Sequence, residues 1–318
     1  MGSSSPSQQF AEANALKEAD ACDEAIHRYD EVLNASPTLH RTHVLALYNQ
    51  AVCFESLGSL DRATANYTQL LSRNDAEARA IHADVQFRRG LVRIAENQPR
   101  AARRDLLAVR HRTTDRTARA RIDVQLGWLD VESRHLARAS HRLLGAIRVL
   151  TGKVSEPTSE AYFLAQALCA LGDVFVAEAS RVDMHRRGVK RTVRALNRRA
   201  ELLSRAQDYY VAAIDQQVPT WAAAAALHLG RAYQAAADEL WEFYSNQQPT
   251  AKPEPTAQAA MQRWLLDRIP TLLRKSFEAY SICQSLGYET GDISRFTRAC
   301  SEALDSFPTE RLTVTQES

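Results

Sequence analysis

The side chains that could carry out catalysis or hold a metal ion do not form a recognisable catalytic motif in this chain. The sequence contains no HExxH, GxSxG or CxxC segment. His40 and His43 lie near each other beside a turn, but no third ligand stands close to them, and zinc sites in proteins use at least three. We therefore predict no catalytic residue, no metal site and no cofactor.

One segment has the glycines and the lysine of a phosphate-binding loop. It runs from Gly145 through Gly152 to Lys153, with six residues between the glycines and Val154 after the lysine. A phosphate loop has four residues between its glycines, places Ser or Thr after the lysine, and follows a strand. The segment here follows an expected helix, so we predict no nucleotide site.

The five cysteines are odd in number and widely spaced: Cys22, Cys53, Cys169, Cys283 and Cys300. Cys53 and Cys169 fall on apolar helix faces, where cysteine packs as a small hydrophobic residue. We expect the cysteines to pack in this way, in preference to forming disulfides or binding a metal. This expectation favours a reducing compartment.

Positive charge is concentrated in the middle of the chain. Residues 88–148 contain 15 arginines and six acidic residues, and residues 181–205 contain nine basic and two acidic residues. Three interpretations are open: a solvated helix face, a surface for an acidic protein, or a nucleic-acid surface. The segments contain few aromatic residues, so base stacking is not indicated.

The elements that position these side chains are expected to be helices. Alanine, leucine and arginine are abundant, and we find no sustained alternation of apolar and polar residues. Six small residues recur at intervals of 38, 39, 37, 45 and 58 positions: Ala13, Ala51, Gly90, Gly127, Gly172 and Gly230. About twelve residues after most of them begins a second pattern of small, large and apolar residues, as in Ala25, Tyr29 and Val32. A period of this size indicates stacked helical hairpins.

We divide the chain accordingly. Residues 1–7 form a flexible tail, and residues 8–151 form four regular hairpins. A break at 151–157 combines Gly152 with Pro157. Residues 158–306 then form two elongated hairpins and a capping helix, and 307–318 form a second tail. Pro270 is expected to kink or split its helix.

The pattern resembles the tetratricopeptide repeat. The strongest match runs from Leu47 through Ala51, Gly58 and Ala63 to Leu71, and Leu171-Gly172 and Leu229-Gly230 match the first half of a unit. The resemblance implies an all-α solenoid of antiparallel helix hairpins wound into a right-handed superhelix. The family period is 34 residues, so each unit here carries about one additional helical turn or a longer connection.

The resemblance also implies a binding groove lined by the first helix of each unit. Carried over position by position, the residues that face a partner are Asn14, Tyr48, Asn49, Glu55, Asp84, Arg88, Arg121, Gln125, Trp128, Asp173, His228 and Arg231. In relatives that clamp a peptide carboxylate, two Asn and one Arg match Asn14, Asn49 and Arg88. The two clamp lysines are replaced here by Phe10 and Asp84. The alternative role for Asn49 is to tie adjacent helix backbones together, and the alternative for Trp128 is packing between units.

The sequence predicts no membrane span and no secretory signal as written, so we expect a cytoplasmic protein. As an alternative, Met1-Gly2-Ser3-Ser4-Ser5 resembles the tether of a mature bacterial lipoprotein whose acylated cysteine is replaced by Met1. That interpretation places the protein in the periplasm or at the outer membrane.

The predicted function is a non-catalytic scaffold or adaptor that binds a peptide or helix of another protein, with an acidic partner as one option. The first alternative is an envelope-tethered lipoprotein scaffold of a secretion, pilus or motility complex. The second is a nucleic-acid-associated regulator that uses the arginine-rich middle.

Overall fold

The computed structural model is all-α. It is 88% helical, and the residues that it describes contain no strand. The described residues are 5–35, 40–151, 159–184, 189–245, 255–290 and 294–312. The predicted fold class is therefore confirmed.

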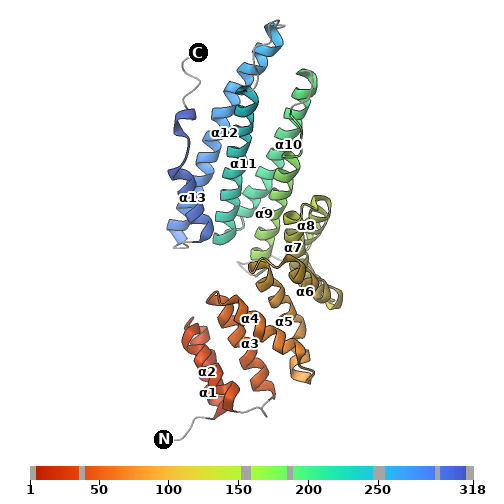
Figure 1. Cartoon of the computed structure of the whole chain (residues 1–318), viewed down its shortest axis with the longest axis vertical. Helices are drawn as coiled ribbons and strands as arrows, with labels where there is room; N and C mark the ends of the chain where they lie inside the picture. Colours follow the sequence, from red (N-terminus) through yellow and green to blue (C-terminus); the bar gives the residue numbers. More distant parts are fainter. Residues whose placement is uncertain are drawn as a thin grey trace. The chain divides into compact units, whose positions relative to one another are not determined.

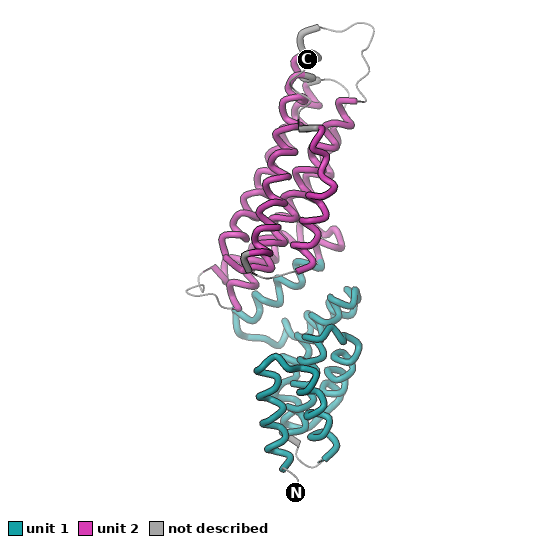
Figure 2. Tube along the Cα trace, turned by 90° about the vertical axis from the view of Figure 1, so that its left-hand side faces the viewer, with its two compact units in different colours: residues 1–129 teal, residues 130–318 magenta. Residues whose placement is uncertain are grey.

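The chain forms two compact units, residues 1–129 and 130–318 (Figure 2). The first contains the helices α1 (Pro6–Glu18), α2 (Cys22–Ala35), α3 (His40–Ser56), α4 (Leu60–Ser72), α5 (Ala76–Ala95), α6 (Pro99–Arg112) and most of α7 (Arg116–Glu132). Successive helices pack as the hairpins α1–α2, α3–α4 and α5–α6, and the first helices also contact one another, α1 with α3 and α3 with α5 (Figure 1). The first helices therefore share one face of this unit.

The second unit contains α8 (Leu136–Leu150), α9 (Ser159–Ala179), α10 (Val189–Ile214), α11 (Pro219–Ser245), α12 (Pro255–Thr290), α13 (Arg295–Asp305) and the short 3₁₀ helix η2 (Thr309–Leu312). Here α9 pairs with α10 and α11 pairs with α12, while α11 also contacts α9 and α13 (Figure 1). The same arrangement of first helices is thus present in this unit, built from longer helices.

Local sequence signals set several helix ends. Ser5 and Gln8 form a reciprocal capping box at the start of α1, and Asp75 and Ser294 accept hydrogen bonds from backbone N–H groups of α5 and α13. These caps satisfy donors that a helix start leaves unpaired. Gly58 follows α3 with φ of 71°, a left-handed conformation that glycine adopts without steric penalty.

The recurrent small residues lie where helices cross. All six are buried. A Cβ atom built on Gly172 would lie 2.5 Å from the ring of Tyr210 on α10, and one on Gly230 would lie 2.5 Å from the ring of Tyr280 on α12. The ring of the second helix thus occupies the space that a side chain on the first helix would need.

Four such tyrosines are among the largest fully buried side chains: Tyr29, Tyr67, Tyr210 and Tyr280. Each hydroxyl donates a hydrogen bond to a polar side chain on the first helix of its own hairpin. The pairs are Tyr29 with Asn14 at 2.7 Å, Tyr67 with Glu55, Tyr210 with Asp173 at 2.6 Å, and Tyr280 with Gln234 at 2.9 Å. A buried hydroxyl without a partner is costly, so these acceptors are part of the packing scheme.

The boundary between the compact units differs from the break predicted at 151–157. The contacts divide the chain between Leu129 and Asp130, within α7. The reason is that α8, assigned from sequence to the first four hairpins, packs closely on α9. Residues 152–158 lie outside the described residues.

Helix α12 is continuous from Pro255 to Thr290, so Pro270 does not split it; the alternative expectation, a kink at Pro270, stays a prediction. The packing of α12 along α11 outweighs the local penalty of about 3 kcal/mol for an interior proline. The start of the expected tail at 307 is also ordered: Phe307 is buried, with its ring centroid 5.3 Å from that of Phe277. The structure does not describe residues 313–318.

The cysteines behave in two ways. Cys22, Cys53 and Cys169 are free and buried, as predicted. Cys283 on α12 and Cys300 on α13 form a disulfide, so the expectation that they only pack is wrong. Their separation of 17 residues is not a recognisable sequence signal, because the contact arises from the packing of α13 on α12.

Helix α9 is long and apolar enough to cross a membrane by length and composition. In the structure, 72% of its apolar window is buried, against α8, α10 and α11. This burial is the environment of a core helix.

Replacing Gly172 with alanine should destabilise the second unit by about 1–3 kcal/mol, because the added methyl group meets the ring of Tyr210. Gly145→Ala is the matched control. It lies within α8, and a Cβ atom added there would have no neighbouring atom within 4 Å, so it should stabilise by about 0.5–1 kcal/mol. Urea unfolding of both variants measures the two effects, and equal effects would contradict the crossing geometry.

Loss of the Cys283–Cys300 disulfide should lower the free energy of unfolding by about 3 kcal/mol, the value for closing a loop of this size in the unfolded chain. Unfolding curves with and without reductant measure it. The Cys283→Ser/Cys300→Ser variant should be insensitive to reductant, whereas Cys53→Ser should keep the full response. Two identical curves for the unaltered chain would argue against the bond.

Candidate binding face and its polar networks

The residues predicted to face a partner all lie on first helices of hairpins. They are Asn14 on α1, Tyr48, Asn49 and Glu55 on α3, Asp84 and Arg88 on α5, Arg121, Gln125 and Trp128 on α7, Asp173 on α9, and His228 and Arg231 on α11. Several of them form side-chain networks within their own unit. Their contact with a partner stays a prediction.

Asn14 and Asn49 bind each other. The Nδ2 atom of Asn49 donates to Oδ1 of Asn14 at 2.8 Å, and the same oxygen accepts the hydroxyl of Tyr29. Lys17 Nζ donates to Oδ1 of Asn49 at 3.3 Å. Asn49 thus links α1 to α3 through side chains, whereas the sequence alternative invoked helix backbones.

Arg88 lies among acceptors of its own chain. Its guanidinium donates to Tyr48 Oη at 2.8 Å and lies 3.3 Å from the carboxylate of Glu55. The Tyr48 hydroxyl in turn donates to Asp84, whose carboxylate is 3.8 Å from Arg88. A peptide carboxylate would have to compete with both acidic residues for this cation.

The remaining predicted residues of the first unit differ in exposure. Asp84 and Arg121 line a pocket of about 220 Å³ with apolar residues that include Phe87 and Ile122. Trp128 is half-buried and Gln125 is 5% exposed. Gln125 therefore offers little surface to a partner in this conformation.

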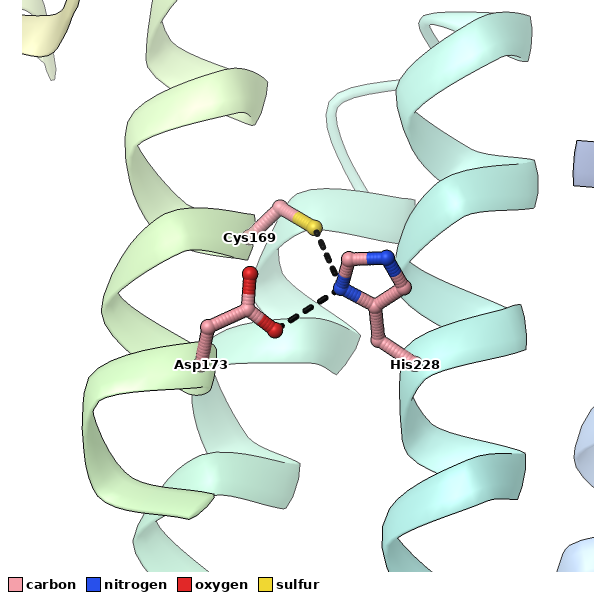
Figure 3. Close-up of side chains that lie close together, drawn as sticks. All are labelled: Cys169, Asp173 and His228. Carbon is pink, nitrogen blue, oxygen red and sulfur yellow. Dashed lines mark hydrogen bonds and ion pairs between the residues drawn. The ribbon is translucent and has the colours of Figure 1, made fainter. Parts of the chain in front are cut away.

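In the second unit, Asp173 and His228 are in direct contact. His228 Nδ1 lies 2.8 Å from Asp173 Oδ1 and 3.9 Å from the sulfur of Cys169, which is fully buried. Figure 3 shows Cys169 and Asp173 projecting from one helix toward His228 on its neighbour. Arg231 is exposed on the same helix as His228. The repeat pattern predicted Asp173 and His228 as groove residues, but it did not predict that Cys169 lies beside them.

This cluster does not have the geometry of a cysteine nucleophile activated by histidine. Both Cys169 and Asp173 face the same ring nitrogen of His228, whereas in a catalytic triad they contact opposite nitrogens. Burial, followed by the charge of Asp173, raises the pKa of the Cys169 thiol well above its usual value. A nucleophilic cysteine needs the opposite shift.

A row of aromatic side chains crosses the first helices of the second unit. Tyr162 on α9 and Trp221 on α11 have ring centroids 5.7 Å apart, and Phe296 on α13 lies 6.4 Å from both Trp221 and His228. Tyr162 is 41% exposed. The sequence missed this row because its members are 59 and 75 residues apart and meet only through the packing of α9, α11 and α13.

Many arginines of the basic middle are paired within the protein. Asp105 is buried between Arg89 at 2.8 Å and Arg93 at 2.6 Å. In the second unit Asp130 is fully buried, with Arg138 at 2.7 Å and Arg142 at 3.1 Å. Ion pairs of this kind compensate a buried carboxylate. Of the three interpretations open for the basic middle, a purely solvated face does not describe these arginines, which pair with buried carboxylates.

A pocket of about 340 Å³ lies between α10, α11 and α12. Its lining combines apolar residues such as Leu203 with the cations Arg199, Arg268 and Lys275. Lys275 stands 5.4 Å from the centre of the Tyr233 ring, and Arg268 stands 5.5 Å from that of Trp264. Sequence reasoning did not identify this pocket, because its lining comes from three long helices.

No family model and no curated protein matches the chain. Solved structures of tetratricopeptide repeat proteins are similar to it. The C-terminal part of such a protein from Cytophaga hutchinsonii is 16% identical with a TM-score of 0.43, covering 85% of this chain and 98% of that one. A repeat protein from Bacteroides fragilis is 12% identical with a TM-score of 0.30, covering 94% and 99%. Yeast Tom70 is 12% identical with a TM-score of 0.28, covering 95% and 69%.

The Glu55 network should make stability depend on pH. Burial raises the pKa of Glu55 above its ordinary value, although the hydrogen bond from Tyr67 and the charge of Arg88 oppose the shift. A carboxyl whose pKa is higher in the folded state binds more protons there, so stability falls as pH rises from about 4 through the folded pKa.

The free energy of unfolding of the unaltered chain, relative to Glu55→Gln, should therefore decrease over this range and level off above it. Urea unfolding at a series of pH values measures the difference. A difference that stays constant from acidic to neutral pH would show that the carboxyl is not perturbed.

Proposed function

We propose that this protein is a scaffold that binds a segment of another protein on the face formed by its first helices. In the second unit this face is formed by α9, α11 and α13, and the aromatic row lies on it. The observation that carries the proposal is this row, with Tyr162 exposed at one end. Aromatic side chains held in place by neighbours are frequent anchors of protein interfaces.

The predicted groove residues Asp173 and His228 support the same face, because His228 belongs both to the aromatic row and to the contact with Asp173. A partner lying across α9 and α11 would meet aromatic surface beside polar groups. Burying both kinds of group matches the composition of protein interfaces, in which an apolar centre is surrounded by polar residues.

An acidic partner segment fits the charges of the second unit. The exposed side of α10 carries Lys190, Arg191, Arg194 and Arg198, of which Arg198 pairs with Glu201. The α10–α12 pocket adds Arg268 and Lys275 beside apolar surface, whereas its third cation, Arg199, pairs with Glu239. Positive surface of this kind speeds association with an acidic partner and orients it.

The envelope-tethered version of this scaffold has one observation in its favour. The Cys283–Cys300 disulfide is a bond that persists in oxidising compartments and is rare in the cytosol. It fits the oxidising compartment of the envelope alternative better than the cytoplasmic expectation. Alkylation of thiols in intact cells, followed by mass analysis of the two cysteines, tests whether the bond exists there.

The nucleic-acid alternative receives less support. At least six arginines between 88 and 148 pair with acidic side chains of the protein: Arg88, Arg89, Arg93, Arg110, Arg138 and Arg142. Pairing reduces the positive charge available to phosphates, and phosphate contacts supply most of such affinity. Binding to a random duplex at low salt would revive this alternative.

Tyr162→Ala should weaken capture of the native partner by about 10-fold or more, the effect expected for an aromatic interface anchor. The measurement is a pull-down from the source cells with partner identification, followed by titration of the identified segment. Tyr288→Ala is the matched control. It removes the same side chain from α12, where it is 79% exposed and outside the aromatic row, and should leave affinity unchanged. Equal affinity for both variants would contradict the assigned face.

A further inference from the structure

Three side chains of the second unit bring different metal-binding atoms together. Cys169 and Asp173 stand one helical turn apart on α9, and His228 reaches them from α11. The sulfur, a carboxylate oxygen and a ring nitrogen all lie within 4.8 Å of one another (Figure 3). Residues four positions apart share one side of a helix, so α9 presents two of the three groups as a pair.

The distances suit a small tetrahedral ion. Bond lengths of about 2.3 Å for zinc–sulfur and about 2.0–2.2 Å for zinc–nitrogen and zinc–oxygen place ligand atoms ~3.6 Å apart for S and N and ~3.4 Å apart for N and O. In the structure the sulfur and Nδ1 are 3.9 Å apart, and Nδ1 and Oδ1 are 2.8 Å apart. Zinc binding would open the second distance by about 0.6 Å and close the first by about 0.3 Å.

The chemical types of these groups favour zinc over magnesium or calcium. A thiolate and an imidazole are ligands of zinc, whereas magnesium and calcium take oxygen ligands. Cys169 is fully buried, while the side chains of His228 and Asp173 are 20% and 21% exposed. The sulfur would thus hold the ion from the interior, and the two partly exposed ligands leave solvent a route to a fourth position.

The surroundings hold the ligands in place. Tyr210 donates its hydroxyl to Asp173 Oδ1 at 2.6 Å, and its ring lies in the space left by Gly172. The hydrogen bond from Tyr210 thus fixes the orientation of the Asp173 carboxylate. Outer partners of this kind orient ligating carboxylates in metal sites.

We propose that Cys169, Asp173 and His228 form a three-ligand zinc site that ties α9 to α11, with water at the fourth position. Zinc binding displaces the thiol proton to solvent and forms the zinc–sulfur bond, with no change of oxidation state. The neutral His228 ring binds zinc through Nδ1 and carries its proton on Nε2. The site lies beside the aromatic row, because His228 also contacts Phe296. It departs from the sequence prediction of no metal site.

The test is titration of the full chain, freed of metal with a chelator, with Zn²⁺ alone in competition with a chromophoric chelator. One equivalent should bind. Cys169→Ser, Asp173→Asn and His228→Gln should each weaken binding at least 100-fold, and Tyr210→Phe should weaken it by about 10- to 100-fold as an outer partner. Cys53→Ser alters a free buried thiol of the first unit and should bind as the unaltered chain does.

Co²⁺ gives a second measurement. The Co²⁺-loaded chain should show visible bands of a tetrahedral ion and a sulfur-to-metal band in the near ultraviolet. Cys169→Ser should lack the sulfur-to-metal band even when enough Co²⁺ is added to overcome its weaker binding. Circular dichroism of each metal-free variant checks that it is folded. If one ligand variant does not fold, the other two still test the site. Absence of stoichiometric Zn²⁺ binding by the unaltered chain, or equal affinity in Cys169→Ser, would overturn the proposal.

Discussion

The fold depends on a tyrosine of one helix packing across a small residue of its neighbour. At Gly172 and Gly230 the ring lies so close that a β-carbon could not be added without movement. The ring brings two helix axes together, and its hydroxyl must then find an acceptor, because an unpaired buried hydroxyl is costly. The acceptor is supplied by the first helix in all four cases described: Asn14, Glu55, Asp173 and Gln234.

This requirement has a consequence for the binding face. The acceptors lie on the first helices, which also carry the residues expected to meet a partner. The polar side chains of the first helices therefore stabilise the packing of the hairpins whether or not a partner binds to them. Asn14 links to Asn49 and Glu55 links to Arg88, so a ligand at these positions would compete with the contacts that hold the hairpins together.

Asp173 shows how one side chain can serve both roles. Its Oδ1 atom accepts the hydroxyl of Tyr210 and also faces Nδ1 of His228 on the next first helix. The packing of Tyr210 over Gly172 thus positions a carboxylate beside a histidine and a buried thiol. The zinc proposal and the partner-binding proposal both concern this part of the second unit and share Asp173 and His228. The partner-binding proposal is carried by the aromatic row, and the zinc proposal by the grouping of these two residues with Cys169.

Sequence alone determined the helical class, the hairpin period and the buried positions from Ala13 to Gly230, because a repeated pattern of small and large residues needs no knowledge of distant contacts. Charge pairing, the disulfide and the continuity of α12 through Pro270 were decided only by the tertiary structure. So were the groupings of Cys169 with His228 and of Tyr162 with Trp221. The ion pairs, the disulfide and the two groupings join residues that are separated in the chain. The continuity of α12 depends on helix packing that outweighs the local preference of proline. The physical reason is that periodicity records which side of a helix is buried, whereas the neighbour that buries it depends on how the helices pack.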